Sequence, residues 1–328
     1  MNEAFVAELE QIANDRVKFD EPLSKYSHYK VGGPATYFFE SKTSEEVVAV
    51  LRACKEHDVA WAILGGGTNV LINDEGFDGL VMKMANRSVQ IDVPSGVVVA
   101  EAGLLSASLA RQTASKGLTG FEWAIGLPGT IGGAVRGNAG CFGSETKVNL
   151  TSVEIYNTET GEVEEKDAAA LQMGYRESAV KHSPWVVLRA TFTLDHQEAE
   201  RNLQKVEEVL ACRMESQPKN ARCAGCAFKN FEFESEDEIA KLKDVYDEDI
   251  PPNFLDSKRI PAGWLIDKAG LKGTRVGPAA VSDVHGNFIT NGGDATADQI
   301  AQLIAVVKTR VRNTFGIQLH EEIQYIGF

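Results

Sequence analysis

Residues 126–143 read GLPGTIGGAVRGNAGCFG, a run of glycines and small residues. Glycine has no Cβ, so each one lets another group approach the main chain and permits a positive φ. The run contains one Asn and one Arg but no acidic side chain, so its main-chain N–H groups suit a phosphate or a flat polar ring. A composition this rich in glycine predicts neither a helix interior nor a well-packed strand. The competing interpretation is a long surface loop.

A second glycine turn, residues 65–69 (GGGTN), follows a predicted buried strand at residues 59–64. It does not match G-x-G-x-x-G, because Val70 occupies the last glycine position, and the chain contains no G-x-x-x-x-G-K-[ST]. The turn therefore predicts neither a Rossmann dinucleotide site nor a P-loop. Its clustered N–H groups, hydroxyl and amide are typical of an anion nest, although a tight turn between strands has the same composition. Two such loops in one chain favour a dinucleotide held by main-chain groups.

The chain has 328 residues, a net charge of −14 and 43% hydrophobic residues. This length allows two or three domains and a large core. The acidic balance argues against general binding to nucleic acids or anionic membranes, but it leaves room for a local basic pocket. The acidic first residues lack the features of a signal peptide, and no apolar run is long enough to cross a bilayer. We therefore expect a cytoplasmic monomer that binds neither nucleic acid nor membrane.

Hydrophobic periodicity predicts short helices and strands in mixed order. Because they do not alternate strictly as βαβ units, the expected fold class is α+β. A domain boundary is expected at Gln217-Pro218, directly after a long charged helix. The expected helices cover residues 3–13, 43–54, 106–116, 197–215, 263–269 and 296–312, and the expected strands cover residues 37–40, 59–64, 80–84, 89–93, 97–102, 152–157, 161–166, 185–194, 285–290 and 317–326.

Cys223 and Cys226 have the spacing of metal ligands, but a tetrahedral zinc site needs a second pair, and no other cysteines are spaced for one. A redox dithiol is a further alternative, although the flanking residues are not a strand-to-helix turn of thioredoxin type. Five cysteines in a chain of this length are not a disulfide framework. In residues 225–230 (GCAFKN) a thiol stands near a cation and an amide, which fits a proton donor or nucleophile facing an anionic ligand. We expect no metal.

Two other short motifs carry candidate residues. Residues 175–178 (YRES) place an arginine between aromatic and small residues, and a lone arginine is most often a surface residue. In residues 321–326 (EEIQYI), Glu322 is in phase with Gln324 and Ile326, which predicts a carboxylate that points inward from a strand. A one-residue change of register would turn it to solvent. The residues alone thus indicate a soluble dinucleotide-binding enzyme with an anionic substrate.

Taken together, the motifs resemble the UDP-N-acetylenolpyruvoylglucosamine reductase family, bacterial flavoenzymes of peptidoglycan synthesis that are also called UDP-N-acetylmuramate dehydrogenases. The resemblance implies an FAD-binding module of two α+β subdomains, of the vanillyl-alcohol-oxidase (PCMH) type, and a C-terminal α+β substrate domain. The shorter, second-type branch is indicated, because Leu194 leads straight into a helix without a tyrosine-bearing loop. The matching motifs occur in the family's order at Gly65–Leu71, Gly126–Gly143, Tyr175–Ser178, Gly225–Asn230, Ala262–Gly273, Val281–Asn291 and Glu322–Gly327.

On this basis we predict four segments. Residues 1–80 and 81–216 form the first and second FAD-binding subdomains. Residues 217–314 form the substrate-binding domain, with an acidic insertion at residues 232–260 for which the sequence offers no role. Residues 315–328 return to the flavin domains as a strand.

The resemblance also implies the reaction. FAD is bound non-covalently, NADPH is the co-substrate, and the substrate is a UDP-sugar enolpyruvyl ether. A hydride passes from flavin N5 to the enol methylene carbon. Arg176 stabilises the negative charge that develops on the enolpyruvyl carboxylate, Glu322 hydrogen-bonds the same region, and Cys226 protonates the adjacent carbon.

Binding residues follow from the same motif matches. Substrate contacts fall on Tyr175, Arg176, Lys229 and Asn230. The implied FAD-binding positions are Leu64, Gly65, Gly66, Gly67, Thr68, Asn69, Val70, Pro128, Gly129, Thr130, Gly132, Gly133, Ala134, Asn138 and Gly140.

The chain departs from the family pattern at several positions. The usual proton donor is a serine, where this chain has Cys226. A thiol, with an ordinary pKa of about 8.5, is a far stronger acid than an alkyl hydroxyl and can do the same work. The proline expected after Asn230 is Phe231, and the arginine common in the last motif is Gln324. The alternatives are an FAD oxidoreductase of the same superfamily acting on a sugar or alcohol, and a non-enzymatic binding module with a metal clip at the cysteines.

Overall fold

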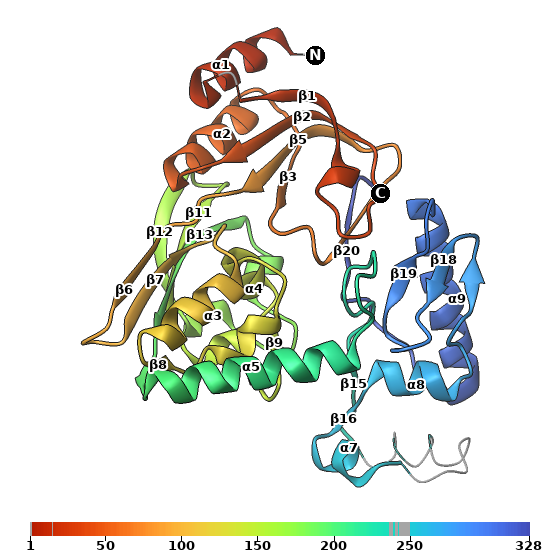
Figure 1. Cartoon of the computed structure of the whole chain (residues 1–328). Coiled ribbons are helices and arrows are strands. Elements are labelled where there is room, and N and C mark those ends of the chain that lie inside the picture. Colours follow the sequence, from red (N-terminus) through yellow and green to blue (C-terminus); the bar gives the residue numbers. More distant parts are fainter. Residues whose placement is uncertain (1, 15, 236–238, 240–241, 243–249) are drawn as a thin grey trace. The chain divides into compact units, whose positions relative to one another are not determined.

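The computed structural model describes residues 2–14, 16–235, 239, 242 and 250–328 (Figure 1). Contacts group the chain into two compact units. Unit 1 comprises residues 1–21, 34–67 and 77–215, and unit 2 comprises residues 22–33, 68–76 and 216–328. The four segments expected from the sequence stay a prediction. Within the expected acidic insertion at 232–260, residues 236–238, 240–241 and 243–249 lie outside the described residues.

The first layer of unit 1 combines two helices with a mostly parallel sheet. Helix α1 (Glu3–Ala13) packs on α2 (Ser44–Glu56), and Thr43 caps α2 by accepting the N–H of Glu46 (3.2 Å). The strand order is β1-β2-β5-β3, and β5 runs parallel to both β2 and β3. These strands are β1 (Lys18–Pro22), β2 (Pro34–Ser41), β3 (Trp61–Leu64) and β5 (Phe77–Met84).

The second layer of unit 1 is an antiparallel sheet of order β12-β11-β13-β7-β6. Helix α4 (Ile131–Arg136) packs against β13 and β7 (Figure 1). Helix α3 (Ser106–Ser115) is linked to α5 (Ala199–Ser216) by the exposed Arg111–Glu207 ion pair (3.7 Å). The strands are β6 (Val89–Asp92), β7 (Val97–Glu101), β11 (Leu150–Asn157), β12 (Glu162–Asp167) and β13 (Trp185–Thr193).

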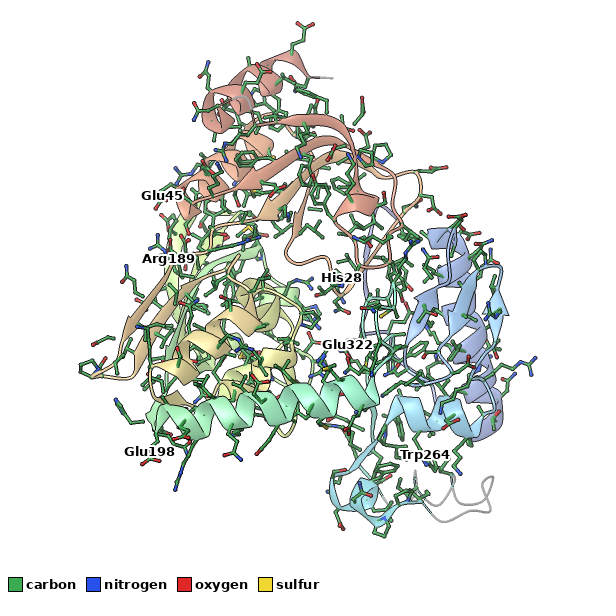
Figure 2. All side chains as sticks on the ribbon, viewed as in Figure 1. His28, Glu45, Arg189, Glu198, Trp264 and Glu322 are labelled. Atoms are coloured by element: carbon green, nitrogen blue, oxygen red, sulfur yellow. The ribbon has the colours of Figure 1, made fainter. Side chains whose placement is uncertain are left out.

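One apolar core runs through both layers of unit 1. It includes Phe39 and Leu51 from the first layer and Val98 and Phe192 from the second. Each such side chain contributes about 1.5–3 kcal/mol on burial. At the surface, Arg189 of β13 reaches Glu45 in the first turn of α2 (3.5 Å; Figure 2), an exposed pair that adds little. The layers are therefore held together mainly by apolar packing.

Short elements complete unit 1. Two small antiparallel pairs join β8 to β14 and β9 to β10. These elements are β8 (Leu118–Thr119), β9 (Gly140–Cys141), β10 (Ser144–Glu145) and β14 (Asp195–His196), with 3-10 turns at Glu122–Gly126, Thr146–Val148, Ala169–Leu171 and Ala179–Lys181.

The glycine run is partly helical, which corrects the expectation that it could not form a helix interior. Gly132 and Gly133 both lie within α4. The Thr130 side chain accepts the N–H of Gly133 at the helix start (3.5 Å), and Ile131 and Val135 are fully buried. Cap and packing thus outweigh the cost of two helical glycines, about 0.5–1 kcal/mol each.

Unit 2 is built on α9 (Ala297–Phe315), which packs on a three-stranded antiparallel sheet, β17-β18-β19 (Figure 1). Thr296 and Gln299 form a capping box at the start of α9. The apolar face of α9, including Ile300 and Val307, is buried in the core of unit 2. The other elements in the described residues of unit 2 are a 3-10 turn at Leu23–Lys25, β4 (Val70–Ile72), β15 (Phe231–Glu232), α7 (Pro252–Asp256), β16 (Arg259–Ile260), α8 (Ala262–Lys268), β17 (Arg275–Val276), β18 (Ala279–Val281), β19 (Ile289–Asn291) and β20 (Gln324–Ile326).

The two early segments of unit 2 are tied to its later part by main-chain and side-chain hydrogen bonds. Strands β4 and β20 form a parallel pair in which Val70 lies opposite Gln324. The buried Asn291 donates to the carbonyl of Tyr29 (2.9 Å). Asp74 accepts the N–H of Ala297 at the start of α9 (2.7 Å).

Two strands differ most from the sequence pattern. The strand expected at residues 285–290 is β19, Ile289–Asn291, because the Ser282 hydroxyl accepts the N–H of His285 (3.4 Å) and turns the chain. The strand expected at residues 317–326 is only β20. Before it, His320 and Glu322 bond to the segment 227–229 rather than to a sheet. In the described part of the chain, no helix is long and apolar enough to span a membrane.

Candidate active site

The two glycine loops meet at Thr130 within unit 1. A Cβ added at Gly65 would lie 2.6 Å from the Thr130 Oγ1, so the first loop approaches as closely as it does only because residue 65 is glycine. The start of α4 is fixed in turn at the end of β7, where Gly132 donates to the carbonyl of Ala102 (2.8 Å). The fold thus brings together two of the stretches that the sequence singled out.

One face of α4 consists of bare main chain. Gly133 and Gly137 are four residues apart and therefore share a face. A Cβ added at Gly133 would have only the Thr130 Oγ1 within 4 Å (3.6 Å), and one at Gly137 only the carbonyl oxygen of Gly133 (3.5 Å). No side chain of the described residues fills this space beyond that hydroxyl. A flat, polar ring system fits such a surface, so the residues present are compatible with a flavin.

Asn138 connects the end of the glycine run to neighbouring segments. It is fully buried with φ at +39°. Its amide donates to Glu145 (2.9 Å) and to the carbonyl of Gly174 (2.7 Å), and its oxygen accepts the N–H of Lys147 (3.0 Å). These bonds tie the end of the glycine run to the turn that carries Arg176.

Arg176 lies in a tight turn closed by hydrogen bonds between Gly174 and Glu177 (3.0 and 3.2 Å). Its φ is +53°, a conformation that costs a non-glycine residue of order 1–3 kcal/mol and is concentrated at functional sites. The guanidinium donates to the carbonyl of Gly140 (2.9 Å) and stacks over the Tyr175 ring (5.2 Å to the centroid). The predicted substrate residues Tyr175 and Arg176 therefore adjoin the glycine run.

Two cationic side chains act on the thiol of Cys141. Burial raises the pKa of its thiol, while the charges of Arg213 and Arg176 act in the opposite direction. Its sulfur is 3.3 Å from the carbonyl oxygen of Trp123. Arg213 belongs to α5, and its side chain packs against Gly126. A Cβ added at Gly126 would lie 2.9 Å from the arginine Cδ. The end of the glycine run is thus locally positive on an acidic chain, which suits an anionic ligand.

The predicted FAD positions divide between the units. Leu64, Gly65, Gly66 and Gly67 belong to unit 1, as do the predicted positions from Pro128 to Gly140. Thr68, Asn69 and Val70 belong to unit 2. There, Asn69 donates from its amide to the carbonyl of Glu322 (3.0 Å) and accepts the N–H of Gln324 (2.9 Å). The end of the first glycine loop is therefore joined to Glu322.

Cys226 and Glu322 are brought together within unit 2. The N–H of Glu322 donates to the carbonyl of Ala227 (2.8 Å), the residue after Cys226. Glu322 lies just before β20 (Figure 2), and Glu321 forms a β-bridge with Phe228. The main chains that carry the predicted proton donor and the predicted carboxylate are therefore adjacent, although they are distant in sequence.

Sequence reasoning missed the residue that fixes this arrangement, Asn287. It is 2% exposed. Its side chain accepts the N–H of Phe228 (2.9 Å) and donates to the carbonyl of Phe228 (2.8 Å), while its own carbonyl accepts the N–H of Ala227 (2.7 Å). The only signal in the sequence was the position of Asn287 in the matching motif at 281–291. Nothing in that motif indicates that the amide bonds the main chain of a distant segment.

The remaining predicted substrate residues, Lys229 and Asn230, come directly after Phe228 in the chain. The N–H of Lys229 donates to the carbonyl of His320 (2.8 Å), and the Asn230 oxygen accepts the N–H of Ala262 at the start of α8 (3.1 Å). Cys223 packs against the core of unit 2. The five cysteines, all within the described ranges, form no disulfide. Among the described residues, no three His, Cys, Asp or Glu side chains are grouped to hold a metal ion.

Two family models match this chain. Residues 35–166 match the family model of an FAD binding domain, and residues 217–326 match that of the UDP-N-acetylenolpyruvoylglucosamine reductase C-terminal domain. A UDP-N-acetylenolpyruvoylglucosamine reductase of Lachnoclostridium phytofermentans is 36% identical over 100% of this chain and 98% of the relative. That of Rubrobacter xylanophilus is 37% identical over 94% of this chain and 95% of the relative.

A solved structure is similar over nearly the same length. The crystal structure of UDP-N-acetylenolpyruvylglucosamine reductase from Thermus caldophilus has a TM-score of 0.73 and 32% identity, covering 95% of this chain and 99% of that one. The fold and the matched domains define an oxidoreductase with an FAD-binding domain. More specifically, the chain belongs to the UDP-N-acetylenolpyruvoylglucosamine reductase family. The predicted α+β fold class, with its flavin-binding module and C-terminal domain, is confirmed.

Proposed function

We propose that this enzyme reduces UDP-N-acetylglucosamine enolpyruvate to UDP-N-acetylmuramate with NADPH, a step of peptidoglycan precursor synthesis. Bound non-covalently, FAD would supply the hydride chemistry that links NADPH to the methylene carbon of the enol. The glycine face of α4 and the loop at Gly65 are proposed to hold it, because that face is main chain left open by missing side chains and the loop packs against Thr130 at its start. A cytoplasmic location and a monomeric state remain predictions.

Arg176 is proposed to stabilise the charge that develops on the enolpyruvyl carboxylate. Fixed cationic donors aimed at such a developing charge are usually the largest single catalytic contribution. Its hydrogen bond to Gly140 and its stacking on Tyr175 support this role, since both restrict the guanidinium before substrate arrives. Lys229 and Asn230 are proposed to contact the substrate diphosphate.

Cys226 is proposed to give its thiol proton to the carbon next to the reduced methylene, with Glu322 bonding the carboxylate region. The observation that supports this proposal most is the main-chain bond from Glu322 to Ala227, because it holds the main chain next to Cys226 against that of Glu322. A positioned general acid contributes typically about 10²- to 10⁴-fold to a rate.

The test separates the two half-reactions of the flavoprotein under anaerobic conditions. NADPH is mixed with Cys226→Ala and the flavin absorbance is followed, and then the enol ether is added. We expect bleaching at the wild-type rate, followed by recovery of the yellow colour slowed about 10²- to 10⁴-fold. Cys226→Ser, which retains a protic side chain, should recover colour much faster than the alanine variant.

Recovery at the wild-type rate in Cys226→Ala would reject the proton-donor role. Protein purified without flavin, or flavin that the enol ether does not reoxidise in the wild type, would reject the proposed reaction. Acid precipitation provides a further control, because non-covalent flavin is released into the supernatant, whereas a covalently tethered flavin stays in the pellet.

A further inference from the structure

Lys181 has a largely buried side chain that the proposed function does not use. The side chain is 12% exposed, and an ammonium group this deeply buried needs polar partners. It donates to the main-chain carbonyl of Arg176 (2.5 Å). The carboxylate of Glu177 is farther away, at 3.8 Å, which is beyond the length of a hydrogen bond. Lys181 is therefore bonded to the peptide group that follows Arg176.

The carbonyl that Lys181 bonds belongs to a turn of an unfavourable type. Gly174 and Glu177 exchange two main-chain hydrogen bonds (3.0 and 3.2 Å). The residues between them, Tyr175 and Arg176, therefore form a two-residue turn. Turns of this length favour a positive φ at the first central residue. Here the second one, Arg176, has a φ of +53°, at a position that glycine or asparagine normally takes. Local sequence thus does not explain why Arg176 keeps this conformation.

The element that carries Lys181 is anchored to α4. Lys181 ends the 3-10 turn at Ala179–Lys181, and its N–H donates to the carbonyl of Ser178 (3.0 Å). Ser178 is 1% exposed, and its hydroxyl donates to the carbonyl of Arg136 at the end of α4 (2.7 Å). The 3-10 turn also packs against α4 and β13. Lys181 therefore reaches the carbonyl of Arg176 from a well-fixed base.

Arg176 is thus restrained at both ends. Its guanidinium is restrained by the bond to Gly140 and by stacking on Tyr175, and its main chain is restrained by Lys181. Without the lysine, the turn can relax toward a negative φ at Arg176. That change redirects the Cα–Cβ bond and carries the guanidinium with it. A displacement of about 1 Å in a catalytic group can cost roughly 10²-fold in rate.

We propose that Lys181 is a positioning residue for the reduction. Its ammonium holds the carbonyl of Arg176 and so keeps the guanidinium directed at the charge that develops on the enolpyruvyl carboxylate. Lys181 itself has no proposed contact with substrate or flavin. The proposal rests on the role of Arg176 in the proposed function, whereas the conformation of the turn can be measured without substrate.

The first test compares two variants of Lys181. Lys181→Met keeps an unbranched side chain of similar length but has no donor, and Lys181→Arg keeps a charged donor. Lys166→Met is the matched control, because Lys166 is also partly buried in unit 1 (25% exposed) but bonds the Glu164 carboxylate within β12 (2.5 Å). Under anaerobic conditions, NADPH reduces the flavin, and the enol ether at a series of concentrations then reoxidises it. Flavin content and thermal stability are measured for every variant.

We expect Lys181→Met to lower the limiting rate of reoxidation at least about tenfold. The half-saturating concentration of the enol ether should change less than about threefold, because a group that acts on developing charge stabilises the transition state rather than the bound substrate. Flavin reduction by NADPH should stay at the wild-type rate, Lys181→Arg should recover most of the loss, and Lys166→Met should behave as wild type.

Equal slowing of both half-reactions in Lys181→Met would show a general structural role and overturn the proposal. Reoxidation at the wild-type rate in Lys181→Met would also overturn it, as would a Lys181→Arg protein as slow as Lys181→Met.

The second test measures the turn directly, by cleavage of the flavoprotein after Arg176 with an arginine-specific protease. Because proteolysis follows the population of the open conformation, we expect Lys181→Met to be cut there at least about tenfold faster than wild type. Lys166→Met should be cut at the wild-type rate. An unchanged rate in Lys181→Met would show that the lysine does not hold the turn. Failure of the proposed reaction appears separately, as wild-type flavin that the enol ether does not reoxidise, and the protease comparison still decides whether Lys181 holds the turn.

Discussion

Asn287 bonds both main-chain groups of Phe228, accepting its N–H at 2.9 Å and donating to its carbonyl at 2.8 Å. Because Ala227 also donates to the Asn287 carbonyl, the segment after Cys226 has three bonds to one residue. The same Ala227 accepts the N–H of Glu322. Asn287 therefore positions the main chains of two proposed catalytic residues without any proposed contact to the substrate.

Asn287→Asp should slow protonation without affecting flavin reduction. The substitution preserves size but replaces the donor to the Phe228 carbonyl with a carboxylate oxygen, which repels it. A displacement of about 1 Å can cost roughly 10²-fold, so we expect reoxidation of the reduced flavin by substrate to fall about 10- to 100-fold. Single-turnover absorbance measurements give both half-reactions separately.

Asn73→Asp is the matched control for that variant. Asn73 likewise bridges main-chain groups in unit 2, donating to the carbonyl of Gly327 (2.8 Å) and accepting the N–H of Glu75 (3.0 Å), but it touches neither Ala227 nor Phe228. It should leave both half-reactions within about twofold of wild type. Equal slowing of the two half-reactions in Asn287→Asp would show a general structural role instead of positioning.

The adjacent glycines of α4 should respond differently to alanine. At Gly133 the protein leaves room for a methyl group, and alanine in a helix is about 0.5–1 kcal/mol better than glycine. Gly133→Ala should therefore keep or raise the stability of the apoprotein while weakening FAD retention. At Gly132 the added Cβ would lie 2.9 Å from the Ala102 Cβ, so Gly132→Ala should lower apoprotein stability itself.

Denaturant unfolding of the flavin-free protein measures apoprotein stability. The ratio of flavin absorbance to protein absorbance in the purified holoprotein measures FAD retention. If Gly133→Ala binds flavin with wild-type affinity, the glycine face of α4 is not part of the cofactor site.

The turn at Arg176 should show a conflict between stability and activity. With φ at +53°, glycine avoids the steric cost that alanine keeps, so Arg176→Gly should unfold with a free energy about 1 kcal/mol higher than Arg176→Ala. Both lose the guanidinium, so neither should support reduction of the enol ether. Urea unfolding of the two variants gives the comparison, and equal stabilities would mean that the turn relaxes when the side chain is removed.

His285 should make the hydrogen bonds around Asn287 sensitive to acid. Burial, with a smaller effect from the Lys272 charge, lowers its pKa from the ordinary value of 6.5, and its Nδ1 accepts the N–H of Asn287 (3.2 Å), which requires the unprotonated nitrogen. Because the folded pKa lies below the unfolded one, this stabilisation is fully present above about pH 6.5 and is lost as the pH falls through the folded pKa. His285→Gln, which does not titrate, should lose less unfolding free energy between pH 7 and 5. An equal loss in both proteins would exclude His285 as the cause.

Much of the fold follows from sequence periodicity. Helix α1 spans the predicted residues 3–13, and α3, α5 and α9 differ from prediction only near their ends, because each carries a continuous apolar face. The failures occur where tertiary contacts outweigh local preference. Helix α4 forms despite its glycines, because a cap and a buried face compensate for them, and residues 317–323 are not a strand, because their hydrogen bonds go to a distant loop.

The candidate site shows the same limit. Motifs single out Arg176, Cys226 and Glu322 as candidate catalytic residues. No pattern along the chain, however, predicts that Ala227 links Cys226 to Glu322. Asn287 is less visible still, because a buried amide that bonds only main chain has no distinctive neighbours in sequence. Its role appears only once the loops are folded against one another.

The pairing of β4 with β20 also constrains when the protein can fold. Asn69 and Glu322, which bond beside this pair, are 253 positions apart. At roughly 5–20 residues per second, a ribosome needs on the order of 10–50 s to synthesise the intervening chain. Throughout that interval β4 and the segment at 22–33 have left the ribosome without their partners, so the order of synthesis makes unit 2 the last part of the enzyme to close.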